Sequence, residues 1–273
     1  MMFDQCFNGA FHVENYITGR YLFGSGNVIS AIAGSIGVLQ DLWANKSLGL
    51  LGYGMSVGHW FDQNNYLEHH IYGDPTFHFK KTYEVDLNKK IREEKDNADY
   101  WNNLLTAPEP EIRALAIVQL YKLLGEEFIP KLIDIYNNDY SFNVRLHVFS
   151  ILAGTRSDEF NELLFTSIND PFEYIRRMSG KLMGEIGDDK YIPVMIHALI
   201  HDESSRIGFS TGRALGQMDN DKVEIEAEKY IADLPDFVDK EKLNTKFERT
   251  DQTTIVDYYM KKLYRLLMMI LSS

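Results

Sequence analysis

The chain has 273 residues, of which 45% are hydrophobic, 25% charged and 13% aromatic. This composition is typical of a folded globular protein and excludes disorder of the whole chain, because so many aromatic side chains favour a buried core. A formal net charge of −12 at pH 7 makes nucleic acid and anionic lipid surfaces poor partners. The single cysteine excludes an intrachain disulfide and a cysteine-rich zinc site.

Glycine usage divides the sequence into parts of different character. Eleven of the 19 glycines fall in residues 1–79, whereas residues 80–96 are rich in charge and the remainder has helical periodicity. We therefore predict two kinds of architecture, an α/β part followed by an all-α part. We predict an α/β segment at residues 1–79 and a connector at residues 80–96. A helical array is predicted at residues 97–233, followed by C-terminal capping helices at residues 234–273.

The α/β segment is predicted to alternate helices and strands. Apolar spacing favours a helix over residues 10–22 and a glycine-bounded, β-branched run favours a buried strand over residues 28–33. A second helix is expected over residues 47–61 and a further strand over residues 76–79, after the turn Gly73-Asp74-Pro75. A sheet of two or three strands would leave an exposed edge and half a core, so the segment is a poor independent domain.

The helical array repeats with a period near 31 residues. Each copy is predicted to hold two helices, an arginine near the start of the first helix, and an aspartate at the turn before it. Aspartate can cap a helix N-terminus, and an arginine on one helix can reach the aspartate of the next copy. The arginines are spaced by 32, 31 and 30 residues, the last copy being looser: Arg113, Arg145, Arg176 and Arg206; the aspartates are Asp139, Asp170 and Asp202.

This pattern resembles the short HEAT repeats, also called PBS-lyase-type HEAT repeats. One helical pair cannot bury its apolar face alone, so such copies stack. The resemblance implies an all-α superhelical solenoid that binds protein partners and is usually not catalytic. The apolar segment at residues 253–271 is interrupted by lysine and arginine, so we expect a capping helix of the solenoid there and no membrane span.

Cys6 is the one candidate nucleophile of the α/β segment. It follows a short apolar run and precedes the predicted helix at residues 10–22, so we expect its thiol at the carboxyl end of a strand and beside a helix N-terminus. At such a place backbone amides and the helix dipole can stabilise a thiolate or an oxyanion. The alternative is that Cys6 is an inert thiol that packs as a small apolar side chain.

Three motifs of residues 1–79 resemble the gingipain-type cysteine peptidases of the caspase-like clan. They are Cys6-Phe-Asn-Gly-Ala-Phe11, the segment Tyr21–Gly37, and Ile71-Tyr-Gly-Asp-Pro-Thr-Phe77. The resemblance implies a partial caspase-like fold, with Cys6 as the nucleophile that attacks a peptide carbonyl and Gly9 in the nucleophile turn. In that family the catalytic histidine lies upstream of the cysteine, where this chain has five residues. We therefore expect the chain to be inactive by itself, as a truncated version of a longer gene product or a natural remnant.

Other sites are weaker candidates. Gly52-Tyr-Gly-Met-Ser-Val-Gly58 approximates a dinucleotide fingerprint but follows no strand. The histidines show no repeated ligand spacing that would indicate zinc, and His12 is interpreted as a surface or packing residue within the first helix. The residues weighed as a metal cluster are His59, Asp62, His69, His70 and His78. No cofactor and no metal is expected.

The leading hypothesis is thus a truncated or remnant gingipain-type cysteine peptidase with an appended HEAT array that binds protein or peptide partners. The alternative is a non-catalytic HEAT-repeat scaffold in which Cys6 is inert. The N-terminal residues show no signal peptide, and the compartment is left open because a longer parent could carry an export signal. Peptide specificity, the partner and the oligomeric state are not readable from the sequence.

Overall fold

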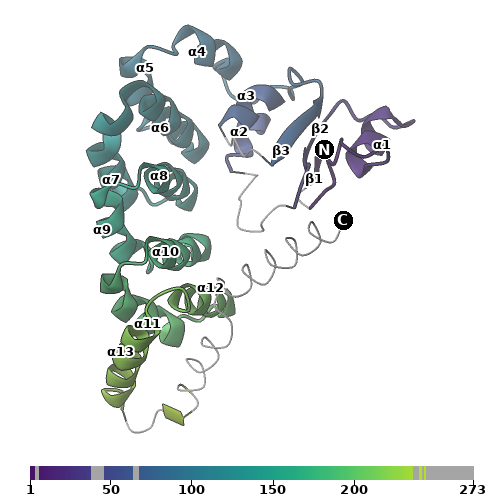
Figure 1. Cartoon of the computed structure of the whole chain (residues 1–273). Helices are drawn as coiled ribbons and strands as arrows, with labels where there is room; N and C mark the ends of the chain where they lie inside the picture. Colours follow the sequence, from purple (N-terminus) through teal and green to yellow (C-terminus); the bar gives the residue numbers. More distant parts are fainter. Residues whose placement is uncertain (4–5, 38–45, 64–67, 236–239, 242, 244–273) are drawn as a thin grey trace, which may run out of the picture. The chain divides into compact units, whose positions relative to one another are not determined.

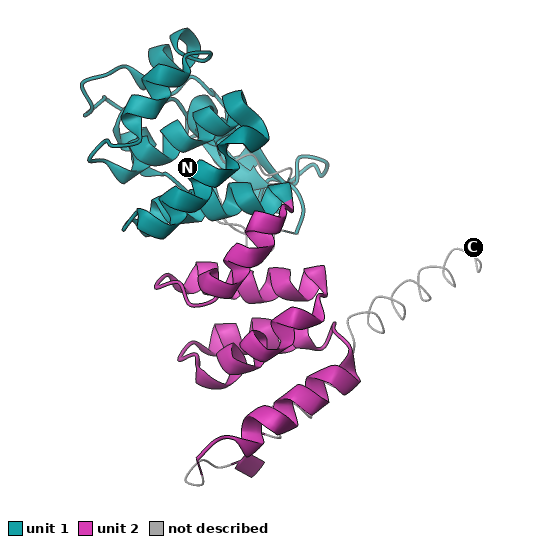
Figure 2. Cartoon of the chain, turned by 90° about the vertical axis from the view of Figure 1, so that its left-hand side faces the viewer, with its two compact units in different colours: residues 1–155 teal, residues 156–273 magenta. Residues whose placement is uncertain are grey.

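The computed structural model describes residues 1–3, 6–37, 46–63, 68–235, 240–241 and 243. The chain divides into two compact units, Met1–Thr155 and Arg156–Ser273 (Figure 2). The first unit holds a small mixed sheet together with helices, and the described part of the second is helical. The predicted combination of an α/β part and a helical part is therefore confirmed, whereas the predicted capping helix at residues 253–271 lies outside the described residues. None of the described helices is long and apolar enough to cross a membrane.

The sheet has the order β1-β2-β3, with β1 at Met2–Phe3, β2 at Ser30–Gly34 and β3 at His69–Gly73. β1 runs parallel to β2, and β3 runs antiparallel to it with Ile71 opposite Ile32. Every residue of β2 is buried, as its apolar, glycine-bounded sequence predicts. Gly73 closes β3 with φ +90, and a Cβ atom there would lie 2.3 Å from the carbonyl oxygen of Ile29, so only glycine fits.

The predicted strand at residues 76–79 is wrong. The ladder partner of β2 is β3, so the Gly-Asp-Pro turn follows the last strand instead of leading into it. The carbonyl oxygen of Phe77 accepts a hydrogen bond from the amide of Val57, the first residue of a helix, at 2.9 Å. Residues 76–79 are therefore tied to helix α3 and not to the sheet.

Two of the predicted helices of the α/β segment are shorter than expected. The helix predicted over residues 10–22 begins only at Ile17, as α1 (Ile17–Phe23). The helix predicted over residues 47–61 is split into α2 (Gly49–Gly52) and α3 (Val57–Asp62). Gly54 between them has φ +88, a left-handed conformation that ends a helix, and the side chain of Ser56 caps the next one by accepting from the amide of His59.

The predicted connector contains one short helix, and a second short helix opens the predicted array. α4 (Leu87–Glu93) is capped by Asp86 and α5 (Ala98–Leu104) by Asn97, whose side chains accept backbone amides three residues on. α4 buries the side chain of Leu87, its first residue. Lys90 near its end forms an ion pair with Glu94, the residue after the helix, at 2.8 Å.

The remaining helices follow the predicted pairs. In the first unit they are α6 (Pro110–Leu124), α7 (Ile129–Asn138) and α8 (Phe142–Thr155), with the 3₁₀ turn η1 (Gly125–Phe128) between α6 and α7. In the second unit they are α9 (Asp158–Ser167), α10 (Glu173–Ile186), η2 (Asp189–Tyr191), α11 (Ile192–His201), α12 (Ser205–Leu215) and α13 (Asn220–Ala232). The first helices of successive copies pack within each unit, α6 on α8 and α10 on α12 (Figure 1).

The repeated arginines and aspartates form the same network in both units. Nε of Arg113 donates to Asp139 at 2.7 Å, and Nε of Arg176 donates to Asp202 at 2.7 Å, each pair being 26 residues apart. The other end of each guanidinium, Nη1, donates to carbonyl oxygens six and five residues earlier in the chain. Within the described residues Arg206 makes no such contact, so the looser fourth copy differs in structure as well.

The aspartates also hold the turns before the next helices. One carboxylate oxygen of each accepts the backbone amide two residues on, at 2.7–2.8 Å, in Asp139, Asp170 and Asp202. The predicted capping is wrong in detail, because the N-caps of α10 and α12 are Phe172 and Ser204 and the aspartates hold the turns before them. The predicted reach of arginine to the next aspartate is confirmed for Asp139 and Asp202, each of which fixes its own turn and binds the preceding copy.

The α/β segment is packed on the first helices of the same unit. α2 contacts α6, and Gln63 at the end of α3 accepts a hydrogen bond from the side chain of Gln119 at 3.0 Å. Lys122 and Asp62 form an exposed ion pair beside it at 2.7 Å. Helices that follow the segment in the sequence therefore add contacts to it at α2 and α3.

Candidate functional site

Cys6 lies in a tight turn just after β1 and is exposed. Phe7, the next residue, has φ +61, a conformation that non-glycine residues adopt rarely and mainly in turns. Residues 4 and 5, which join the strand to the turn, lie outside the described residues. The expected position of the thiol after a strand is therefore borne out.

The helix expected to follow the cysteine directly begins later in the chain. α1 begins at Ile17, and the carbonyl oxygen of Asn8 accepts hydrogen bonds from both the amide and the hydroxyl of Thr18 in its first turn. His12 lies in the turns before α1 rather than within a helix, and it is exposed. The first turn of α1 is therefore attached to the turn that carries Cys6 through Asn8.

The backbone amides after Cys6 are already used by the sheet. The amide of Phe7 donates to the carbonyl oxygen of Ile36 at 3.0 Å, and that of Gly9 donates to Gly34 at 2.8 Å. These bonds extend the pairing of β1 and β2 through the turn. They leave the amides of Phe7 and Gly9 unavailable as donors to a developing oxyanion, which such catalysis requires.

Gly9 has a packing role in the turn. A Cβ atom at this position would lie 2.5 Å from the hydroxyl oxygen of Tyr72 and 2.9 Å from the Cβ atom of Ala33. The Tyr72 hydroxyl donates to the carbonyl oxygen of Gly9 itself. The turn that carries Cys6 can therefore approach β2 and β3 only because residue 9 has no side chain.

The histidines weighed as metal ligands serve separate purposes. Nε2 of His70 is hydrogen-bonded to the hydroxyl of Ser35 at 2.8 Å, and its ring packs edge-on against Phe11. His69 is buried in β3, and His59 and His78 line a pocket elsewhere in the unit. Across the part of the chain that the structure describes, no group of three or more potential ligands could hold a metal ion.

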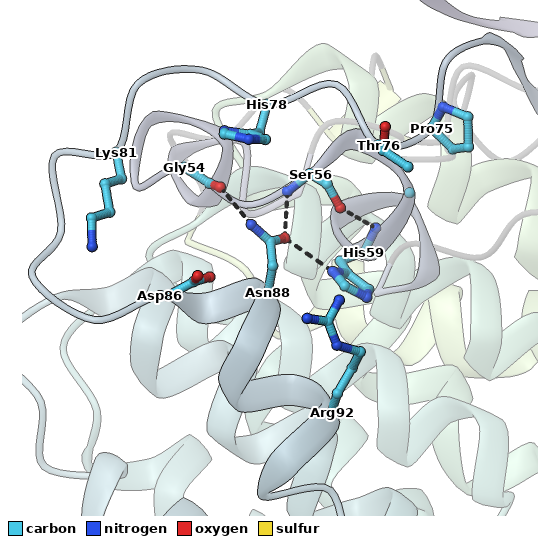
Figure 3. Close-up of a pocket in the computed structure, with 11 residues that line it drawn as sticks. Gly54, Ser56, His59, Pro75, Thr76, His78, Lys81, Asp86, Asn88 and Arg92 are labelled. Atoms are coloured by element: carbon cyan, nitrogen blue, oxygen red, sulfur yellow. Dashed lines mark hydrogen bonds between the residues drawn. The ribbon is translucent and has the colours of Figure 1, made fainter.

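The pocket lies in the first unit, between α3, α4 and the loop that follows β3 (Figure 3). Its volume is about 610 Å³, which is within the usual range for a small-molecule site. One face comes from Ser56 and His59 at the start of α3, and another from Asn88 and Arg92 on α4. His78 and Lys81 reach it from the loop, on the side away from Arg92.

Asn88 organises this pocket. Its amide nitrogen donates to the carbonyl oxygen of Gly54 at 2.8 Å, which identifies the other side-chain atom as the acceptor oxygen. That oxygen accepts from the amide of Ser56 at 2.7 Å and lies 3.0 Å from Nδ1 of His59. Nδ1 of His59 therefore carries the proton, and Nε2 is the atom left to meet a ligand.

A buried polar cluster joins the α/β segment to α8. The hydroxyl of Ser47, which has φ +54, lies 2.6 Å from Nε2 of His147, and both side chains are buried. Burial lowers the pKa of His147 to about 3, with a smaller contribution from the positive charge of Lys46. Burial likewise lowers the pKa of Lys46 to about 8. All three side chains are buried, so we expect the cluster to act on stability.

Sequence reasoning missed both the pocket and the buried cluster. His59 and His78 were considered only as zinc ligands, and Lys81, Asn88 and Arg92 fell within a segment predicted to be a solvated connector. His147 lies in the apolar run of α8 with no local signal that it meets Ser47, 100 residues earlier. A scan against models of known protein families finds no match for this chain, and a search of curated proteins finds none either.

Proposed function

We propose that the chain combines a HEAT-type array that binds a protein partner with the cysteine-bearing part of a gingipain-type peptidase domain. The observation that carries the first half is the recurrence of one Arg–Asp network, at Arg113 and Asp139 and again at Arg176 and Asp202. Identical spacing, helix order and hydrogen-bond partners support a stack of like repeats. Stacked repeats of this class form superhelical solenoids that offer long surfaces to proteins.

An exposed aromatic group in the second unit supports a protein-binding role. Phe209 on α12 is 67% exposed, although α12 buries its opposite face on α10 and α11. The guanidinium of Arg213 lies 5.6 Å from the centre of its ring. Phenylalanine and arginine are both enriched at protein interfaces relative to the rest of the surface.

A photo-cross-linking amino acid at Phe209 tests this proposal. Benzoylphenylalanine at position 209 is expected to cross-link one protein in cells, whereas the same group at the exposed Glu224 of α13 is expected not to. Phe209→Asp should weaken co-purification of that protein by about 30-fold, because an interface anchor contributes ~2 kcal/mol. Equal cross-linking from both positions, or unchanged co-purification, would contradict a partner site on α12.

The second half of the proposal rests on the turn at Cys6. An exposed thiol at the carboxyl end of β1, a left-handed residue after it and a parallel neighbour strand support a nucleophile turn. In the complete domain Cys6 would attack a peptide carbonyl, with a histidine from an earlier strand as the base. The alternative, a non-catalytic scaffold with an inert thiol, is favoured by the engaged amides of Phe7 and Gly9.

Alkylation of Cys6 tests whether the turn presents its thiol to a substrate. We expect no hydrolysis of fluorogenic peptides by the chain, and complete native carboxymethylation of Cys6 by iodoacetamide, read by intact mass. The rate should match that of the urea-denatured chain within about threefold, since the thiol is exposed in the turn. Alkylation of the native chain that is slower by about tenfold or more would contradict the nucleophile turn, because a peptide could not reach a shielded thiol. Hydrolysis that disappears in Cys6→Ala would overturn the expected inactivity.

A further inference from the structure

The pocket of the first unit has an excess of positive groups, in a protein whose net charge is −12. The charged and ionisable groups among its lining residues are His59, His78, Lys81, Asp86 and Arg92, so Asp86 is the one carboxylate among them. One oxygen of that carboxylate already accepts a hydrogen bond from the amide of Lys89 and caps α4. The positive groups of the pocket therefore favour the binding of an anion, although the net negative charge of the chain as a whole repels anions.

Two donors that face the pocket, on Arg92 and Ser56, have no acceptor among the described residues, and a third, on Lys81, has a weak one. Arg92 makes no hydrogen bond or ion pair with any residue that the structure describes, and its guanidinium points from α4 toward the ring of His59 (Figure 3). The hydroxyl of Ser56 accepts from the amide of His59, which leaves its own hydrogen to be donated. On the other side of the pocket the side chain of Lys81 reaches only the backbone carbonyl oxygen of Glu84, at 3.3 Å.

The backbone fixes these groups more firmly than a surface loop would. Asn88 on α4 binds Gly54, Ser56 and His59, so it ties α4 to the start of α3 on which two of the donors sit. Gly58 donates its amide to the carbonyl oxygen of Pro75 at 2.8 Å and thereby holds the loop that carries His78. The donors are therefore pre-arranged, which lowers the entropic penalty of binding.

We propose that this pocket binds a small molecule through a phosphate group, with Arg92, His59 and Ser56 as its donors. Guanidinium groups bind phosphate oxygens in pairs, and Lys81 on the other side of the pocket adds a mobile positive charge. The donors come from α3 and α4 and approach from two directions, which suits a tetrahedral anion better than a planar carboxylate. The volume of about 610 Å³ leaves room for an organic part attached to the phosphate.

Calorimetric titration of the whole chain with inorganic phosphate at constant ionic strength tests the site. Binding of phosphate is expected, and Arg92→Gln should weaken it by about 10- to 100-fold, the value of one charge-assisted hydrogen bond. Lys81→Gln provides a second variant on the other side of the pocket, expected to weaken the binding of inorganic phosphate less than Arg92→Gln does, by about threefold at most. Lys89→Gln is the matched control, since it removes the same charge from α4 at an exposed position paired with Glu93, outside the pocket.

Sulfate and succinate at the same concentrations identify the ligand class. Sulfate should compete with phosphate, because it is tetrahedral as well, whereas succinate should not. Succinate binding with equal affinity would replace the phosphate assignment by a dicarboxylate. No phosphate binding, or equal binding by Arg92→Gln and Lys89→Gln, would overturn the site. The outcome is independent of the HEAT and peptidase proposals, since neither Phe209 nor Cys6 contributes to the pocket.

Discussion

Arg113→Met is expected to lower the free energy of unfolding of the first unit by about 3–5 kcal/mol, the usual effect of removing one partner from a buried ion pair. The guanidinium and the carboxylate of Asp139 are only 7% and 11% exposed, and they share two hydrogen bonds of 2.7 and 2.9 Å. Methionine fills a similar volume but leaves the carboxylate uncompensated. It also leaves the carbonyl oxygens of Ala107 and Pro108 without their shared donor.

Lys122→Met on the same helix is the control for this prediction. It removes an ion pair with Asp62 whose side chains are 47% and 60% exposed, so the expected loss is below about 1 kcal/mol. Hydrogen exchange of the α6 and α8 amides is the appropriate measurement, because a chain of two units need not unfold in one step. Adding Asp139→Asn to Arg113→Met should restore part of the loss, since asparagine keeps the acceptor for the amide of Ser141. Equal effects of Arg113→Met and Lys122→Met would show that the network is dispensable.

Acid is expected to destabilise the first unit by about 3 kcal/mol between pH 6.5 and pH 4 through His147 alone. In the unfolded chain this imidazole takes up a proton near pH 6.5, whereas burial holds its pKa at about 3 in the folded protein. The stabilising difference is therefore complete above about pH 6.5 and is lost progressively as the pH falls toward 3. Lys46 adds nothing in this range, because its folded pKa of about 8 keeps it charged in both states below pH 7.

Denaturation in urea at pH 7 and pH 4.5, followed by the fluorescence of the buried Trp60 and Trp101, measures this loss. His147→Gln is the comparison, because glutamine can still share a hydrogen bond with Ser47 but does not titrate. The difference in stability between the two pH values should shrink by about 2–3 kcal/mol in this variant. An equal acid sensitivity of His147→Gln and the parent chain would assign the effect to carboxylates elsewhere.

The repeats were predictable because their signal is local and recurs. Aspartate and arginine occur six residues apart in two of the copies, and each copy holds its own helices, so periodicity and turn chemistry locate the elements. The break within residues 47–61 was less predictable. Its apolar spacing continues through Gly54, and only the left-handed backbone at that residue shows that one helix ends there.

The contacts that decide the candidate sites connect distant segments. Thr18 binds back to Asn8 and delays α1, Asn88 ties α4 to α3, and His147 meets Ser47. No periodic pattern encodes such pairs, because each depends on which surfaces the tertiary fold brings together. The turn at Cys6 was predicted in position, whereas its relation to a helix was not, since that relation depends on the contact of Asn8 with Thr18.

The bond between Ser47 and His147 also sets an order of events during synthesis. The two residues are 100 positions apart, and a ribosome adds roughly 5–20 residues per second, so about 5–20 s separate their appearance. Within that interval Gln63 has no Gln119 to bind until 56 further residues have been added. The α/β segment therefore cannot complete its packing within the first unit until α8 has left the ribosome.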